Sequence, residues 1–310
     1  MPFHREEVEA MSRQVSIFSR QSYGLARACR VWEVARSGMY AWRQRCQRPA
    51  GHTRARPGPQ GPCSDEQLVK HARQALQESP FHGEGYRKVW ARLRFKGIRT
   101  SKERVRRLMR EHGLQAPHRV GRPRGPVAHD GTITTERPNQ MWGTDMTATV
   151  TTDEGQAAVM IAVDHCSFEC VGIHASKSAN RFQALEPVRQ AVAERLGGFA
   201  ADVGEGLAIR HDHGTAYLSD TFQAELAFLG IESSPAFVRE PEGNGCAERF
   251  IRILKENLLW VQTFANVEEL RNALHEFKER YNREWILERH DYMTPRKAAE
   301  AAALGVVQAA

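Results

Sequence analysis

Residues 142–260 show an order of apolar patterns that limits the folds open to this chain. Short strand-like runs come first, and longer runs with helical spacing then alternate with further short runs. The predicted strands cover 142–150, 156–164, 168–174, 207–211 and 231–234, and the predicted helices cover 179–196, 219–229 and the segment after Gly245. Three consecutive strands followed by alternating helices and strands indicate a mixed α/β domain.

Three acidic residues fall at informative places in this order. Asp145 lies mid-way along the first predicted strand, and Asp212 directly follows the fourth. Glu248 lies in the first turns of the last predicted helix, after the turn-rich run at 241–245. A strand centre, a strand end and a helix can bring three side chains together at one sheet edge.

Converging carboxylates repel one another, and binding cations offsets that cost. Oxygen ligands without thiols favour Mg²⁺ or Mn²⁺, and two such ions about 3.5–4 Å apart suit phosphoryl transfer. The simpler interpretation is that each acid is an ordinary surface residue, as most Asp and Glu are. His211 and His213 flank Asp212, but strand alternation would turn both away from its side chain, which disfavours a zinc site.

The three acids lie in the sequence motifs WGTD, HDHGTAYLSDTF and GNGCAERF, and 35 residues separate Asp212 from Glu248. In these motifs and this spacing the chain resembles the catalytic core shared by retroviral integrases and one large family of bacterial insertion-sequence transposases. A basic residue seven positions after the Glu is typical of these transposases, and Lys255 stands there. The resemblance implies a ribonuclease-H-like core with a mixed five-stranded sheet. It also implies that Asp145, Asp212 and Glu248 are catalytic and hold two Mg²⁺ ions, with Mn²⁺ able to substitute.

The function that the resemblance implies is that of a Mg²⁺-dependent DNA transposase. Such an enzyme binds the ends of a mobile element, hydrolyses a phosphodiester and joins the exposed 3′-hydroxyl to another strand. Family members pair DNA ends as multimers, so a homo-oligomer on DNA is implied, and many act with an upstream-frame helix-turn-helix protein. Two alternatives stay open: a non-catalytic DNA-binding regulator of transposition, and a metal-dependent nuclease of the same fold.

Basic side chains on the Glu248 helix are expected to contact DNA. Arg252 and Lys255 share a helix face with Glu248, and Arg249 is adjacent. Ion pairing within the helix is the simpler explanation, but an acid that holds a metal leaves these cations for a phosphate or a base. Asn244 is assigned to the same DNA-contacting set and is expected to help the chain turn beside the metal site.

Charge is distributed unevenly along the chain. Residues 1–140 contain 28 Lys and Arg against 12 Asp and Glu, whereas residues 141–310 contain 16 against 25. A basic front half and an acidic back half indicate that the front binds phosphates while the back carries the chemistry. A solvated basic face without a partner is the alternative.

A basic helix pair lies within 64–114, where Ser64 and Ser101 are expected to cap helices. The pattern resembles the helix-turn-helix that precedes the core in this transposase family. Its last helix suits DNA recognition, although a charged solvent face would have the same composition. The basic residues assigned to DNA contacts there are Lys102, Arg104, Arg106, Arg107 and Arg110.

Segments rich in Pro, Gly and Arg divide the chain into expected domains. These are a helical segment with a helix-turn-helix at 1–46, a linker at 47–63, a second helix-turn-helix-like DNA-binding domain at 64–114, a linker at 115–140, the catalytic core at 141–262 and a helical tail at 263–310. In the first helix-turn-helix, Ser37 is expected to cap the second helix.

Targeting signals and disulfide patterns are not evident. The six cysteines form no CxxC pair, so reduced thiols are expected. The sequence shows neither a signal peptide nor an apolar run of membrane-spanning length. We therefore expect a cytoplasmic protein with no membrane partner, and the family resemblance implies a bacterial protein that associates with the nucleoid when bound to DNA.

Overall fold

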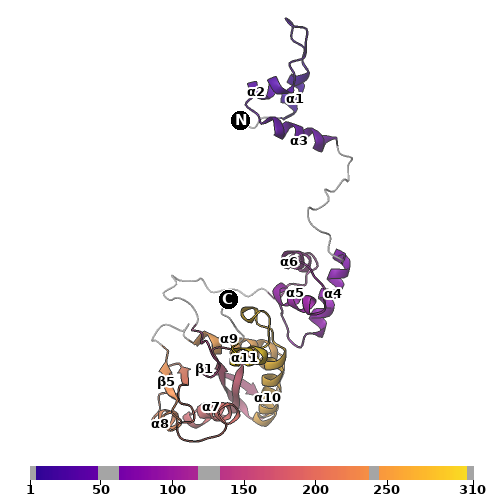
Figure 1. Ribbon diagram of the computed structural model, residues 1–310. Coiled ribbons are helices and arrows are strands. Elements are labelled where there is room, and N and C mark those ends of the chain that lie inside the picture. The colour runs from indigo at the N-terminus through magenta and orange to yellow at the C-terminus, as the bar shows by residue number, and fades with distance from the viewer. Residues whose placement is uncertain (1–4, 48–62, 118–132, 237–243, 306–310) are drawn as a thin grey trace. The chain divides into compact units, whose positions relative to one another are not determined.

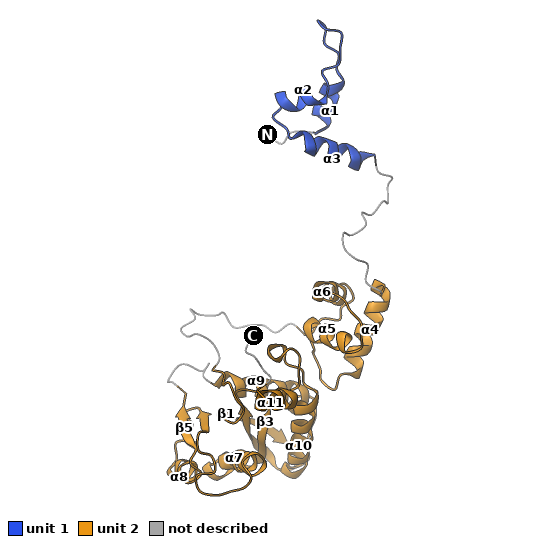
Figure 2. Cartoon of the chain, viewed as in Figure 1, with its two compact units in different colours: residues 1–60 blue, residues 61–310 orange. Residues whose placement is uncertain are grey.

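A computed structural model describes residues 5–47, 63–117, 133–236 and 244–305 of the chain. The chain divides into two compact units, residues 1–60 and 61–310 (Figure 2). Most of the two predicted linkers, at 47–63 and 115–140, lies outside the described residues.

The first unit contains helices α1 (Arg5–Arg13), α2 (Leu25–Val31) and α3 (Arg36–Cys46), which enclose a small apolar core around Val8 and Met39. An ion pair of 2.6 Å between Glu9 and Arg43 joins α1 to α3. The prediction that Ser37 caps the second helix is wrong. Helix α3 begins earlier, its N-cap residue is Ala35 with extended backbone angles, and Ser37 is already helical.

The second unit begins with helices α4 (Asp65–Glu78), α5 (Tyr86–Phe95) and α6 (Lys102–Glu111). Ser64 caps α4 in a capping box with Gln67, and Ser101 caps α6 by accepting a hydrogen bond from the Arg104 backbone, as predicted. The inward faces of these helices bury a continuous apolar stripe. Helical periodicity therefore identified these elements correctly.

The described part of the second unit holds a β-sheet flanked by helices (Figure 1). This sheet has five strands in the order β3-β2-β1-β4-β5. The strands are β1 (Met141–Thr151), β2 (Gly155–Asp164), β3 (Cys170–Ser176), β4 (Ala208–His211) and β5 (Glu232–Pro235). β1, β2 and β3 pair antiparallel, whereas β4 and β5 add in parallel on the other side of β1. This is the mixed α/β sheet that the sequence predicted, and each strand overlaps its predicted range.

Helices cover both faces of the sheet. They are α7 (Arg181–Arg195), α8 (Asp220–Phe228), α9 (Gly245–Leu254), the π-helical turn η2 (Lys255–Leu259), α10 (Val267–Glu284), the 3-10 turn η3 (Glu288–His290) and α11 (Pro295–Ala303). None of the helices in the described ranges has both the length and the apolar character needed to cross a membrane.

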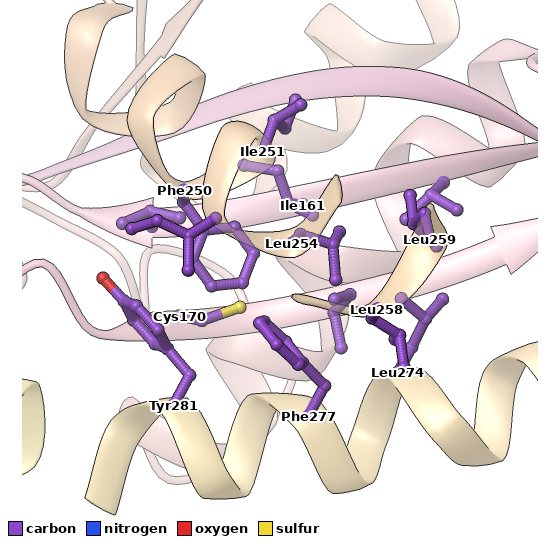
Figure 3. Close-up of a cluster of buried hydrophobic side chains, with 14 of the residues drawn as sticks. Ile161, Cys170, Phe250, Ile251, Leu254, Leu258, Leu259, Leu274, Phe277 and Tyr281 are labelled. Atoms are coloured by element: carbon purple, nitrogen blue, oxygen red, sulfur yellow. The ribbon is translucent and has the colours of Figure 1, made fainter. Parts of the chain in front are cut away.

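Strand β2 is buried on both faces and so divides the core into two apolar clusters. One face, with Val159 and Ile161, packs against α9 and α10, and Figure 3 shows Phe250, Phe277 and their neighbours filling this layer. The other face, with Ala162, packs with residues of α7 and α8. Asp145 of β1 is paired with Ile161, so its side chain lies on the α9 face of the sheet.

Candidate active site

Asp145 is half-buried in the middle of β1, the central strand of the sheet. Its Oδ1 accepts a hydrogen bond of 2.8 Å from the backbone of Met146. Burial raises the pKa of Asp145 to about 6, and the negative charges of Asp212 and Glu248 raise it further, while the Met146 hydrogen bond and the charge of Lys255 oppose the rise. The carboxylates of three separate elements thus interact electrostatically at Asp145.

Asp212 comes directly after β4 and is exposed. Strands β1 and β4 are parallel, and their last paired residues are Gly143 and Arg210, so Asp145 and Asp212 each follow this pair by two residues. Asp212 Oδ1 accepts a hydrogen bond of 2.8 Å from the backbone of Gly214, a local turn that follows the strand. The parallel register therefore explains why these two acids meet.

Glu248 is an exposed residue in the first turn of α9. Phe250 and Leu254 are buried in the core on the other side of this helix, and Glu248 lies on the side turned away from the core. The N-terminal end of a helix favours a negative charge. Packing of the apolar face thus fixes which side of α9 is turned away from the core.

The donor set of these acids suits a hard divalent cation, because it consists of oxygens only. Two of the three side chains are exposed, so they can rotate toward an ion. Within the described ranges, no group of three or more His, Cys, Asp or Glu side chains already has the arrangement of an ion-binding cluster. The raised pKa of Asp145 indicates that a nearby positive charge would stabilise the ionised site.

Basic residues predicted to contact DNA follow Glu248 along the same helix. Lys255 is half-buried at the start of the π-helical turn, close enough to Asp145 to lower its pKa. Arg252 is exposed, and so is Arg249, whose guanidinium carbon lies 5.9 Å from the Phe168 ring centroid. These positions are compatible with DNA contacts, which stay a prediction.

Asn244 differs from the other members of that predicted set because it is buried. Its Nδ2 donates a hydrogen bond of 2.8 Å to the backbone carbonyl of Thr144 in β1. In this structure Asn244 therefore ties the start of α9 to the central strand, and its side chain does not face solvent where DNA would bind.

The five basic residues of α6 fall into distinct environments. Arg104 and Arg107 both pair with Asp65 of α4, at 2.7 Å, and their hydrogen bonds, Arg107 foremost, lower the pKa of Asp65. Lys102 lies over the rings of Trp90 and Tyr292, and Arg106 lies over Tyr86. Arg110 is exposed. Two of the five residues thus help to hold α6 against α4.

Family models match most of the second unit. An HTH-like domain matches residues 64–122, and two models of the integrase core domain match residues 135–241 and 229–295. The curated Transposase InsD for insertion element IS2A/D/F/H/I/K of Escherichia coli is 26% identical over 228 residues, which cover 71% of this chain and 74% of that protein. The chain carries an integrase core domain and is similar to insertion-sequence transposases. The InsD protein of element IS2D from Escherichia coli strain K12 matches equally well.

Solved structures that align with part of this chain include an intasome and an integrase core domain. A simian T-cell lymphotropic virus intasome in complex with the PP2A regulatory subunit B56 gamma aligns with a TM-score of 0.45 and 21% identity, over 68% of this chain and 70% of that chain. The HTLV-2 integrase catalytic core domain in complex with magnesium aligns with a TM-score of 0.40 and 21% identity, over 53% of this chain and 97% of that chain. The family assignment depends on the sequence matches.

The two histidines on either side of Asp212 differ in their exposure to solvent. His211 is buried, and its ring nitrogens lie 2.6 Å from the Asp212 carbonyl oxygen and 2.9 Å from Ser233 Oγ. Its ring stacks on Tyr217. Both nitrogens are thus engaged away from the carboxylates, as strand alternation predicted, whereas His213 is exposed.

Asp164, at the end of β2, has a structural role. Its Oδ1 accepts hydrogen bonds from the backbones of Cys166 and Ser167 and from Ser167 Oγ, and its Oδ2 accepts one from the backbone of Asn139. This buried carboxylate therefore organises the turn between β2 and β3.

Two residues near the site were not identified from sequence. His165 is buried beside Gly143, which lies two residues before Asp145 on β1. Gly143 belongs to the word WGTD, so a glycine at this strand position was the available signal. Finding His165 requires knowledge of the sheet, because it contacts β1 only through tertiary structure.

Proposed function

We propose that this chain is the catalytic subunit of a DNA transposase that binds the ends of an insertion sequence. It hydrolyses a phosphodiester there to expose a 3′-hydroxyl, and that hydroxyl then attacks a second DNA strand. The observation that carries this proposal is the electrostatic interaction of Asp145 with Asp212 and Glu248 on an integrase-type sheet.

Asp145, Asp212 and Glu248 would hold two Mg²⁺ ions, or Mn²⁺ in their place, which activate the attacking oxygen and stabilise the leaving oxygen. Asp145 is half-buried on the central strand and would supply one ligand from there, whereas the exposed side chains of the other two acids would adjust to the DNA. No covalent enzyme intermediate is needed, because the reacting oxygens come from water and from DNA.

Basic residues would guide the DNA to these carboxylates. Lys255 is suited to a phosphate close to the reacting bond, because its charge already acts on Asp145. Arg249 and Arg252 extend the positive surface along α9. The HTH-like domain, with Lys102, Arg106 and Arg110 on α6, would bind the element end. We further propose that two or more copies act together on paired ends, with an upstream-frame protein as an additional partner.

The test uses purified protein, Mg²⁺ or Mn²⁺, and labelled duplexes carrying the DNA that flanks the gene. We expect the wild type to cleave and join strands, and Asp145→Asn and Glu248→Gln to bind DNA without any cleavage. Cleavage without joining would favour a nuclease of the same fold. DNA binding by all three proteins without metal-dependent cleavage would contradict the transposase proposal and favour a regulator.

A further inference from the structure

Two buried polar atoms lie against the backbone of Gly143. A Cβ atom at this position would lie 2.6 Å from Asn244 Oδ1 and 2.8 Å from His165 Nε2. Both distances are shorter than a real Cβ atom tolerates, so a larger residue would displace these side chains. The space beside β1 that a side chain would occupy is thus taken by two groups from other elements.

Other hydrogen bonds fix the orientation of both groups. Asn244 Nδ2 donates to the Thr144 carbonyl, and exchanging the amide oxygen and nitrogen would set two acceptors against each other. His165 Nδ1 lies 2.9 Å from the Ile133 carbonyl oxygen, so Nδ1 carries the hydrogen and Nε2 is an acceptor in the neutral ring. Gly143 therefore faces two acceptors with set directions.

Both acceptors are buried, and neither Asn244 Oδ1 nor His165 Nε2 has a hydrogen-bond partner among the described residues. An unsatisfied buried acceptor costs about 1–3 kcal/mol. Such a cost opposes folding, so it indicates that the arrangement serves something besides stability. The residues that adjoin Asn244 and its hydrogen-bond partner indicate which role this arrangement has.

The contact joins the two segments that carry catalytic acids. Thr144, whose carbonyl accepts from Asn244, directly precedes Asp145 in β1. Asn244 directly precedes α9, and Glu248 stands one helical turn later. Any movement of Asn244 along β1 would therefore change the distance between the Asp145 and Glu248 carboxylates.

We propose that Gly143, His165 and Asn244 are positioning residues that set the separation of the Asp145 and Glu248 carboxylates for metal binding. Gly143 permits the close approach, and the Asn244 hydrogen bond fixes the start of α9. His165 fills the remaining space beside Gly143. This inference rests on the proposed function, because it assigns the contact to the metal-binding acids.

The test compares the full-length wild type with Asn244→Ala, Gly143→Ala and the double variant. The matched control is Asn266→Ala, which removes an amide oxygen that caps α10, a helix without any of the three acids. Four quantities are measured: Mn²⁺ affinity of the DNA-free protein by electron paramagnetic resonance, DNA affinity by fluorescence anisotropy, kcat at saturating DNA, and the melting temperature.

We expect Asn244→Ala to weaken Mn²⁺ binding and to lower kcat by about 10- to 100-fold, the usual loss when a group that orients metal ligands is removed. DNA affinity should stay that of the wild type. Asn266→Ala should lower the melting temperature without changing Mn²⁺ affinity. Because Gly143→Ala acts by displacing Asn244, its effect on Mn²⁺ affinity should be smaller in the Asn244→Ala background.

Unchanged Mn²⁺ affinity in Asn244→Ala would overturn the inference. It would also be overturned if the control Asn266→Ala lost as much Mn²⁺ affinity and kcat as Asn244→Ala. If Gly143→Ala does not fold, the Mn²⁺ affinity of Asn244→Ala alone tests the inference. A wild type that binds Mn²⁺ without cleaving DNA would refute the transposase proposal. The Mn²⁺ affinities of the variants relative to the wild type would still test the positioning role. A wild type that binds no Mn²⁺ would overturn both.

Discussion

Replacing Asp145 by Asn should stabilise the metal-free protein at neutral pH. The half-buried carboxylate has a pKa raised from its ordinary value of 3.8 to about 6 by burial and by its acidic neighbours. The native state therefore binds the proton more tightly than the unfolded chain does. The amide of Asn can still accept the hydrogen bond from Met146 but carries no charge.

The magnitude follows from the shift in pKa. Each unit is worth about 1.4 kcal/mol, so a rise from 3.8 to about 6 destabilises the ionised native state by up to about 3 kcal/mol. This cost is absent below pH 3.8, because both states are then protonated. It grows as the pH rises from about 4 to about 6 and is complete above that window.

Differential scanning calorimetry in EDTA between pH 4 and pH 8 measures this difference. At pH 8 we expect Asp145→Asn to melt about 6–12 °C above the wild type, given about 2–4 °C per kcal/mol for a unit of this size. At pH 4 the difference in melting temperature between Asp145→Asn and the wild type should become small. Glu205→Gln, a change at an exposed carboxylate before β4, is the control and should shift the melting temperature little. Equal melting temperatures of Asp145→Asn and wild type at pH 8 would refute the electrostatic reasoning.

Other changes have equally specific consequences. Lys255→Ala should raise the pKa of Asp145 further, because the Lys255 charge lowers it, and a carbon-13 carboxylate titration would detect this; an unchanged pKa would place Lys255 too far away. Asp65→Asn should free the two α6 arginines paired with it and destabilise the helical domain by about 1 kcal/mol. If those arginines then reach phosphates, the salt dependence of DNA binding, measured by fluorescence anisotropy, should steepen by about 1 per added contact. Gly172→Ala should prevent folding, because its Cβ would overlap the Pro187 carbonyl oxygen of α7, and circular dichroism with a native-like melt would contradict this.

Much of the secondary structure could be predicted from the sequence, because it depends on interactions between residues that are close together in the chain. Ser64 and Ser101 were recognisable as helix caps because a cap depends on residues within one turn. Strand and helix order followed from periodicity, since burial on one face repeats every two or every 3.6 residues. Asp145 and Asp212 could be selected as candidate site residues from the sequence motifs around them and from their spacing. Both follow the last residue pair of the parallel strands β1 and β4 by two residues.

Tertiary structure alone decided how side chains are used where distant segments meet. Asn244 was assigned to DNA, yet it is buried and bonded to a strand 100 residues away in sequence. Arg104 and Arg107 have the composition of a recognition helix, but Asp65 of another helix engages both. No local pattern encodes such contacts, because each depends on two segments that only the folded sheet and helices bring within hydrogen-bonding distance.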